Sequence, residues 1–458
     1  MGITGIVFTL GFFATLVMSF TRHPRYGLYA YLAAFYVHPP SRWWGASLPD
    51  LRWSLLAAAV TLIALWKAKA KDERISWSST TPGKTLILFT IWIWIQSAWA
   101  LDSQMHSELA VLYTKYIVLF YLIYKICDSP EEIERFLLAH VVGCFYLGYL
   151  AFSQPVSGRL EGVGGPGIDE ANALAMQLAT AVMCGAMFVL SDRGPKLYVS
   201  IFSMAFILNG IVLCGSRGAF LSVIAGGLVL HFMKPKAHRV LFYALSTLGL
   251  MLFLIVANES FWQRISTIGA AVNHDEQMDN SAESRFVIVE AQTRMAAKYP
   301  MGTGHRGTEI LSREYIDEKY LTKRADGTPG ARASHNTFMT ALVEQGIPGA
   351  IVFVIFTWWS IKAARQLKRA SLDFPPKTIA SIAAISGALM VVLIAGIFVD
   401  YLKAEVQIWL FALLASMHSY VFKNKQLASI ASPTQVTPAL PNQKNPRRRN
   451  GPKPLGIQ

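Results

Sequence analysis

The chain alternates between long apolar runs and short polar connections over most of its length. An apolar run of roughly 18 to 20 residues is long enough to cross a bilayer as an α-helix. We predict about thirteen such spans, of which the second is short for a complete crossing. They are Ile3–Phe20, Tyr26–His38, Leu51–Trp66, Lys84–Leu101, Leu109–Ile126, Ile133–Phe152, Ala171–Leu190, Lys196–Cys214, Gly218–Met233, Val240–Ala257, Pro348–Ala364, Thr378–Val399 and Leu402–Phe422. The pattern predicts an all-α fold, a polytopic bundle of about 12–13 transmembrane helices.

One long polar segment, from about Asn258 to Ser334, interrupts this pattern. A connection this long is generally functional or disordered. Within it, Ser281–Tyr299 reads as a helix with a capped start, which argues against simple disorder. We therefore predict four parts. They are an N-terminal transmembrane bundle (1–257), a large, partly helical loop with a candidate catalytic segment (258–347), C-terminal transmembrane helices (348–422) and a disordered basic cytoplasmic tail (423–458).

Composition and charge agree with a membrane location. Of the 458 residues, 53% are hydrophobic and only 15% are charged, a balance that a soluble domain cannot usually solvate. The net charge of +14 gathers in short connections and in the tail. That distribution fits orientation by the positive-inside rule, with the lipid bilayer as the partner, better than it fits nucleic-acid binding. The basic connections are Lys67–Arg74, Arg193–Lys196, Lys234–Arg239 and Lys362–Arg369.

Counting spans from these cytoplasmic connections places the long polar segment on the opposite face. We therefore expect a multi-pass membrane protein whose large loop faces outward, which in a Gram-negative cell is the periplasm. The connection 153–170 and the tight turn Cys214–Arg217 fall on the same side. Arginines from separate places in the chain then share one face, which makes a candidate anion site.

Motifs for metals and cofactors are not found. The four cysteines lie in or beside apolar segments and form neither a CxxC motif nor a Cys/His cluster. The sequence also has no Asp-x-Asp, His-Glu-x-x-His, Gly-x-Ser-x-Gly or P-loop motif. We expect no metal and no cofactor. An enzyme of this kind needs a donor that already carries a leaving group, such as a lipid-linked diphosphate whose charge arginines can stabilise.

Arg217 begins a predicted helix directly after Gly215 and Ser216. A helix N-terminus offers free backbone N–H groups, and an arginine adds a bidentate donor for phosphate oxygens. The alternative is an arginine that anchors the helix at the membrane interface. Because arginine opposes the helix dipole at this end, we favour a binding role.

Two other arginines have less specific surroundings. Arg159 lies in a glycine-rich stretch, residues 158–167, that reads equally as an ordered loop or a flexible linker. Arg285 follows the predicted helix start and lies near Glu283 and Glu290, so it could instead complete a helical salt bridge.

His335 is the candidate general base. The run Ser334–Phe338 predicts the start of a helix that ends near Gln345, before the next span. A neutral imidazole at the membrane edge can accept a proton near neutral pH, although spacing alone favours a capping or interface histidine. His305 is a second candidate, and its Gly-rich surroundings favour an ordinary loop residue.

These residues resemble the O-antigen ligase and polymerase superfamily. The resemblance lies in Ser216-Arg217-Gly218-Ala219, in the long loop with Arg285, and in His335-Asn336-Thr337-Phe338 followed by Leu342, Glu344, Gly346 and Gly349. The order of spans and loop is similar over nearly the whole chain. The early run Tyr36-Val37-His38-Pro39-Pro40, with Trp43-Trp44-Gly45, resembles the branch of O-glycosylation ligases associated with exosortase systems.

The resemblance implies a metal-independent, inverting glycosyltransferase of the bacterial inner membrane, with its active site on the periplasmic face. Such an enzyme transfers a glycan from undecaprenyl diphosphate to a hydroxyl of a glycan, lipid or protein acceptor. It implies that Arg217 and Arg285, with Arg159, bind the pyrophosphate and that His335 is the general base. A polysaccharide polymerase of the same superfamily is the alternative.

A transporter of lipid-linked glycans or polysaccharides is the alternative of another class. A transporter is expected to carry ionisable residues within its spans. In this sequence the notable charges lie at the outer ends of the spans. The exception is a group between the last two spans, Asp400, Lys403 and Glu405, which we interpret as an outer turn.

Overall fold

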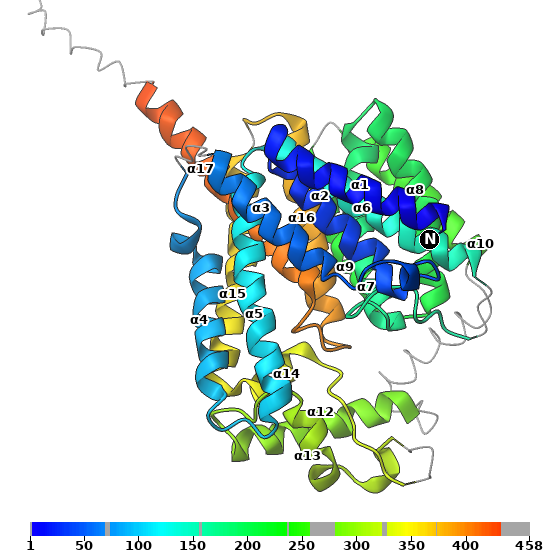
Figure 1. Cartoon of the computed structure of the whole chain (residues 1–458), viewed down its shortest axis with the longest axis vertical. Coiled ribbons are helices and arrows are strands. Elements are labelled where there is room, and N and C mark those ends of the chain that lie inside the picture. The colour runs from blue at the N-terminus through cyan, green and yellow to red at the C-terminus, as the bar shows by residue number, and fades with distance from the viewer. Residues whose placement is uncertain are drawn as a thin grey trace, which may run out of the picture.

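The computed structural model describes residues 2–68, 74–154, 158–235, 238–256, 280–322, 328–371 and 373–431. Within these residues helices joined by turns and irregular connections make up the chain, and no β-strand is formed (Figure 1). The α-helices are α1 (Ile3–Thr21), α2 (Arg25–Val37), α3 (Trp53–Ala68), α4 (Thr81–Gln96), α5 (Ser103–Ile126), α6 (Pro130–Ser153), α7 (Ala171–Ser191), α8 (Pro195–Cys214), α9 (Arg217–Met233), α10 (Arg239–Val256), α12 (Asn280–Lys298), α13 (Gly307–Tyr315), α14 (Thr337–Glu344), α15 (Gly346–Ala370), α16 (Pro376–Ala395) and α17 (Glu405–Ala431).

Each predicted span coincides with one helix, and the fold class is confirmed. Seven of the described helices are long and apolar enough to cross a membrane: α1, α5, α6, α7, α8, α15 and α16. Shorter apolar helices include α3 and α9. The predicted helix 281–299 is α12, whereas the rest of the predicted loop from 258 to 279 lies outside the described residues, as does the tail from 432 onward. Helix α17 continues past the predicted end at Phe422 to Ala431.

The core of the bundle is built on α7 and α16, whose side chains are buried on nearly every face. Small residues allow helices to approach closely where the bilayer gives no hydrophobic drive for them to associate. At the contact between α9 and α16, a Cβ on Gly387 would lie 3.2 Å from the carbonyl oxygen of Gly226. Close backbone packing therefore holds α9, and Arg217 at its start, against the core of the bundle.

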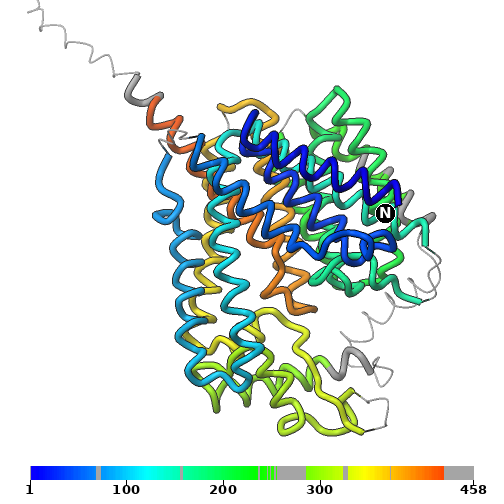
Figure 2. The backbone as a smooth tube through the Cα atoms, in the orientation of Figure 1, coloured from blue at the N-terminus to red at the C-terminus, as the bar shows by residue number. Residues whose placement is uncertain are grey.

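Helices α12, α13 and α14 form a small second core at one end of the bundle (Figure 2). Ile288, Ala291 and Met295 of α12 pack with Leu311 of α13 and Val343 of α14, and all five are buried. Helices α4, α5 and α15 extend to this end, whereas α17 projects from the opposite one (Figure 1). The described residues of the polar segment thus form a packed cap.

Two glycines join this cap to the bundle. Gly302 and Gly346 have φ angles of 84° and 68°, a region that residues with a side chain rarely adopt. A Cβ on Gly346 would lie 2.4 Å from the backbone nitrogen of Gly302. The crossing is held by hydrogen bonds from Ile347 N to Pro300 O (2.8 Å) and from Thr303 N to Val343 O (3.0 Å). The two segments can cross this closely only because neither residue has a side chain.

Candidate functional site

In the segment before α14, the side chains of Ser334 and Asn336 make hydrogen bonds that hold the start of the helix, whereas the His335 ring does not. Asn336 caps the helix, because its Oδ1 accepts hydrogen bonds from Phe338 N (2.9 Å) and Met339 N (3.1 Å). The Ser334 hydroxyl accepts hydrogen bonds from Gln292 of α12 (2.8 Å) and Thr340 (2.7 Å). Within the described part of the chain, no hydrogen bond to the His335 ring is found. The predicted start of a helix here is confirmed, and the cap is Asn336, which leaves the His335 ring available for chemistry.

Replacement of Asn336 by Ala is expected to loosen the start of α14. Loss of an Asn cap costs about 1 kcal/mol, which corresponds to roughly fivefold faster opening of the first turn. Hydrogen exchange at the Phe338 and Met339 amides measures the effect. Asn336→Asp keeps the capping oxygen and should exchange at the wild-type rate, and equal protection in the Ala variant would contradict the capping role.

His335 lies in a basic and half-buried environment. Burial, together with the positive charges of Arg332 and Arg285, lowers the pKa of His335 to about 4. Arg285 comes from the first turns of α12 and Arg332 from the segment just before His335. The imidazole is therefore neutral at physiological pH, and its lone pair is available to accept a proton.

Arg332 is a further arginine of this cluster that sequence reasoning did not select. Burial lowers its pKa, and its backbone N–H donates to the Ser312 hydroxyl of α13 at 2.8 Å. Guanidinium groups remain charged in proteins at neutral pH. The sequence feature that could have identified Arg332 was its position three residues before His335.

Arg159 is hydrogen-bonded to the turn between α8 and α9, and Arg217 follows that turn. Gly215 ends α8 in the left-handed region with φ 56°, and the Ser216 hydroxyl accepts from Ala219 N at 3.3 Å, so that Arg217 is the first residue of α9. The Arg159 guanidinium donates to the Cys214 carbonyl (3.1 Å) and to Asn172 Oδ1 (2.8 Å). The glycine-rich stretch is thus tied to the turn that carries Arg217.

The connection between α16 and α17, residues 396–404, lies between these two groups, and we call it the α16–α17 segment. Thr337 donates to Val399 O (2.9 Å) and accepts from Tyr401 N (2.8 Å), while Tyr401 Oη donates to Asn172 O (2.8 Å). On the α9 side, a Cβ on Gly218 would lie 2.9 Å from the Phe398 side chain. The segment therefore links the His335 region to the surroundings of both Arg159 and Arg217.

Of the three residues expected in an outer turn, Asp400 and Lys403 lie in the connection between α16 and α17, whereas Glu405 is the first residue of α17. Glu405 is partly buried and accepts hydrogen bonds from Tyr31 (2.7 Å) and Trp409 (3.1 Å). Burial and the nearby Glu344 carboxylate raise the pKa of Asp400 to about 7. Asp400 and Glu405 are partly buried because α5, α14 and α17 pack around the segment, whereas the Lys403 side chain is exposed.

His305 is likewise more than an ordinary loop residue. Its Nδ1 lies 3.1 Å from Glu344 Oε2, and its Nε2 lies 3.2 Å from Lys403 Nζ. The His305 backbone N–H donates to the buried His106 Nδ1 at 3.0 Å. Sequence reasoning named His305 as a second candidate and Glu344 as part of a motif, but spacing alone could not pair residues from three separate segments.

The helices define the class: this is an all-α, multi-pass membrane protein. Residues 202–354 match the family model described as O-Antigen ligase, which confirms the resemblance seen in the sequence. The match covers about a third of the chain and supports membership of the O-antigen ligase superfamily, as an O-antigen ligase- or polymerase-like membrane glycosyltransferase. The matched residues include Arg217, Arg285 and His335, whereas Arg159 precedes them. A search of curated proteins found no match.

Proposed function

We propose that this protein transfers a glycan from undecaprenyl diphosphate to an acceptor hydroxyl, at the periplasmic face of a bacterial inner membrane. The observation that carries the proposal is the grouping of a neutral His335 with Arg285 and Arg332. A general base and cations that stabilise a departing diphosphate are the two functions that such a transfer needs. The family match supports the same class of reaction.

In the proposed reaction, His335 takes the proton of the acceptor hydroxyl while the oxygen attacks the anomeric carbon of the donor. The bond between that carbon and the diphosphate oxygen breaks, and undecaprenyl diphosphate leaves with the electron pair. Arg217, Arg285 and Arg159 hold the diphosphate, and Arg332 adds positive charge next to the base. Attack from the side opposite the leaving group inverts the anomeric configuration.

The acceptor separates the two enzyme functions in this superfamily. A ligase uses a lipid, protein or other glycan, while a polymerase extends the growing glycan itself. Both use the same donor chemistry, so the arginines and His335 serve either one. We place ligase activity first and polymerase activity second.

A transfer assay tests the proposal. Purified protein, undecaprenyl-diphosphate glycan and candidate acceptors are combined in EDTA. We expect transfer to persist under chelation, and the size of the product to separate a single ligation from polymerisation. If wild-type protein requires added divalent metal, the metal-independent mechanism is wrong.

The acid limb of the pH profile should report the low pKa of His335. A base is active only when unprotonated, so activity falls as the pH drops through its pKa. With a pKa of about 4, about nine-tenths of His335 is unprotonated at pH 5, against roughly one-thirtieth for an unperturbed histidine. Arg332→Gln removes a positive charge, raises the pKa of His335 and moves the acid limb of kcat/KM to higher pH.

Comparison of wild type with Arg332→Gln between pH 4 and 8 measures this shift. Arg313→Gln, on the neighbouring α13, is the control and should leave the limb in place. A limb near pH 6.5 in the wild type would contradict the low pKa of His335, and an unmoved limb in Arg332→Gln would show that Arg332 does not contribute to it.

A further inference from the structure

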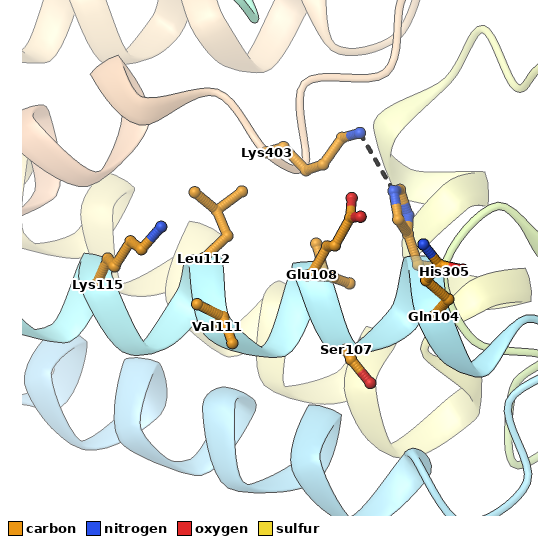
Figure 3. A pocket seen from close by; sticks show the side chains of 9 residues that line it. Gln104, Ser107, Glu108, Val111, Leu112, Lys115, His305 and Lys403 are labelled. Carbon is orange, nitrogen blue, oxygen red and sulfur yellow. Dashed lines mark hydrogen bonds between the residues drawn. The ribbon is translucent and has the colours of Figure 1, made fainter. Parts of the chain in front are cut away.

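Two hollows open along the second half of α15, and both have Ile361 and Arg365 in their linings. The first, of about 330 Å³, lies between α9, α15 and α16. The second, of about 510 Å³, lies along α15 itself. Helix α15 begins beside the cap, where His305 and Lys403 line a cavity on α5 (Figure 3). The two hollows are therefore at the opposite end of α15 from the candidate site.

The first hollow is apolar over most of its length. Phe232 of α9 and Leu393 of α16 line it, and its two serines are already satisfied. The hydroxyls of Ser360 and Ser386 each donate to a carbonyl of their own helix at 2.7 Å. On α16 the lining runs from Ser386 to Leu393, about 10 Å of helix. This space suits a hydrocarbon chain, because its interior offers no free donor from the described residues that line it.

Positive charge gathers where the two hollows meet. The last turns of α15 carry four cations, Lys362, Arg365, Lys368 and Arg369. They follow one another at spacings of three or four residues, so they share one side of the helix, where like charges repel. No ion pair or hydrogen bond of these four side chains is found within the described part of the chain. An anion bound among them would relieve the repulsion.

The arrangement matches a lipid with a phosphate headgroup and two chains. A guanidinium binds phosphate oxygens in bidentate fashion, and Arg365 is the residue that the two hollows share with Ile361. One chain fits between α9, α15 and α16, and the other lies along α15 beside the exposed Trp358. A polyprenyl phosphate has only one chain. The basic tail, with Arg447–Arg449, has the same sign of charge as the cations of α15 and is repelled.

We propose that α15 carries a binding site for an anionic diacyl phospholipid at the end of the bundle predicted to face the cytoplasm. Arg365 and Lys368 bind the phosphate, and the acyl chains fill the two hollows. Basic pockets between transmembrane helices on this side of a membrane bind anionic headgroups. The site is separate from the proposed glycan transfer and does not depend on it. Because the lipid fills the space between α9 and α15, binding should also raise the unfolding midpoint.

Native mass spectrometry of the full-length, delipidated protein tests the assignment. The probes are phosphatidylglycerol and phosphatidylethanolamine with the same acyl chains. We expect one phosphatidylglycerol to bind at least about fivefold more tightly than phosphatidylethanolamine, and to raise the unfolding midpoint in detergent. Arg365→Gln with Lys368→Gln should weaken phosphatidylglycerol binding about tenfold or more, since each Lys or Arg near an anionic headgroup contributes about fivefold.

The matched control is Lys67→Gln with Arg193→Gln. These exposed residues belong to other basic connections on the same predicted face and line neither hollow, so phosphatidylglycerol binding should be unchanged. Ala364→Phe keeps every charge but fills the first hollow, and should weaken binding as well. The paired variants alter only exposed side chains, and their lipid-free unfolding midpoints should equal that of the wild type.

Four results would overturn the site. They are equal binding of the two phospholipids by the wild type, equal losses in the Arg365/Lys368 and Lys67/Arg193 variants, full binding by Ala364→Phe, and displacement of phosphatidylglycerol by an equal concentration of undecaprenyl phosphate. The third would place the lipid on the surface of α15 and not in the hollow. The fourth would assign the hollows to a lipid with a single chain.

Discussion

Replacement of His335 by Gln is expected to reduce glycan transfer by about 10² to 10⁴-fold, the usual contribution of a general base. Glutamine can occupy the same space but cannot take a proton from the acceptor. The loss should appear in kcat, because the diphosphate is proposed to bind to the arginines and not to His335. Single-turnover transfer with pre-bound donor measures the step directly.

Folding should not change in this variant. The Ser334 and Asn336 side chains make the hydrogen bonds that start α14, while none to the His335 ring is found among the described residues. The thermal unfolding midpoint in detergent should therefore equal that of the wild type. His231→Gln, at the other end of α9 from Arg217, is the control and should remain active. Full activity in His335→Gln would remove this residue from the mechanism.

Much of the fold was predictable because the bilayer imposes a length on apolar segments. The apolar runs gave the positions of the helices, including the short α2 of 13 residues. The helix 281–299 and the start of α14 followed from local capping signals, and both are present. These features depend on residues that are neighbours in sequence.

The pairings within the candidate site were not predictable in the same way. Arg285 lies near His335, and Tyr401 joins Thr337 to Asn172, although these residues are far apart along the chain. Such contacts depend on how α12 and α14 pack in the second core and on how the α16–α17 segment folds back between α5 and α14. A short loop of charged residues between two spans looks like a solvated turn until those partners are known.

Two arginines on α12 show that the positions of charged residues in the sequence do not define a binding site. Arg285 and Arg294 both lie on α12, and in the sequence only the resemblance to the O-antigen ligase superfamily distinguishes Arg285. In the structure Arg294 donates to Tyr315 O at 2.8 Å, while the charge of Arg285 acts on His335. The direction of each side chain, set by α12 packing on α13 and α14, decides which one belongs to the candidate site.

Replacement of Arg285 by Gln is accordingly expected to lower kcat for transfer by about 10² to 10³-fold, since removal of one group that stabilises developing charge costs about 2.7–4 kcal/mol. Arg285→Lys keeps the charge but not the bidentate geometry, and its kcat should lie between those of Arg285→Gln and the wild type.

Loss of Arg285 also raises the pKa of His335. Removing one of the groups that depress this pKa brings it no higher than the ordinary 6.5, so at pH 8 the base stays unprotonated. The defect measured at that pH therefore reports loss of diphosphate stabilisation alone. Arg294→Gln is the matched control on the same helix and should transfer at nearly the wild-type rate. Equal defects in both variants would mean that the charge of α12 matters only in sum, and that Arg285 holds no diphosphate.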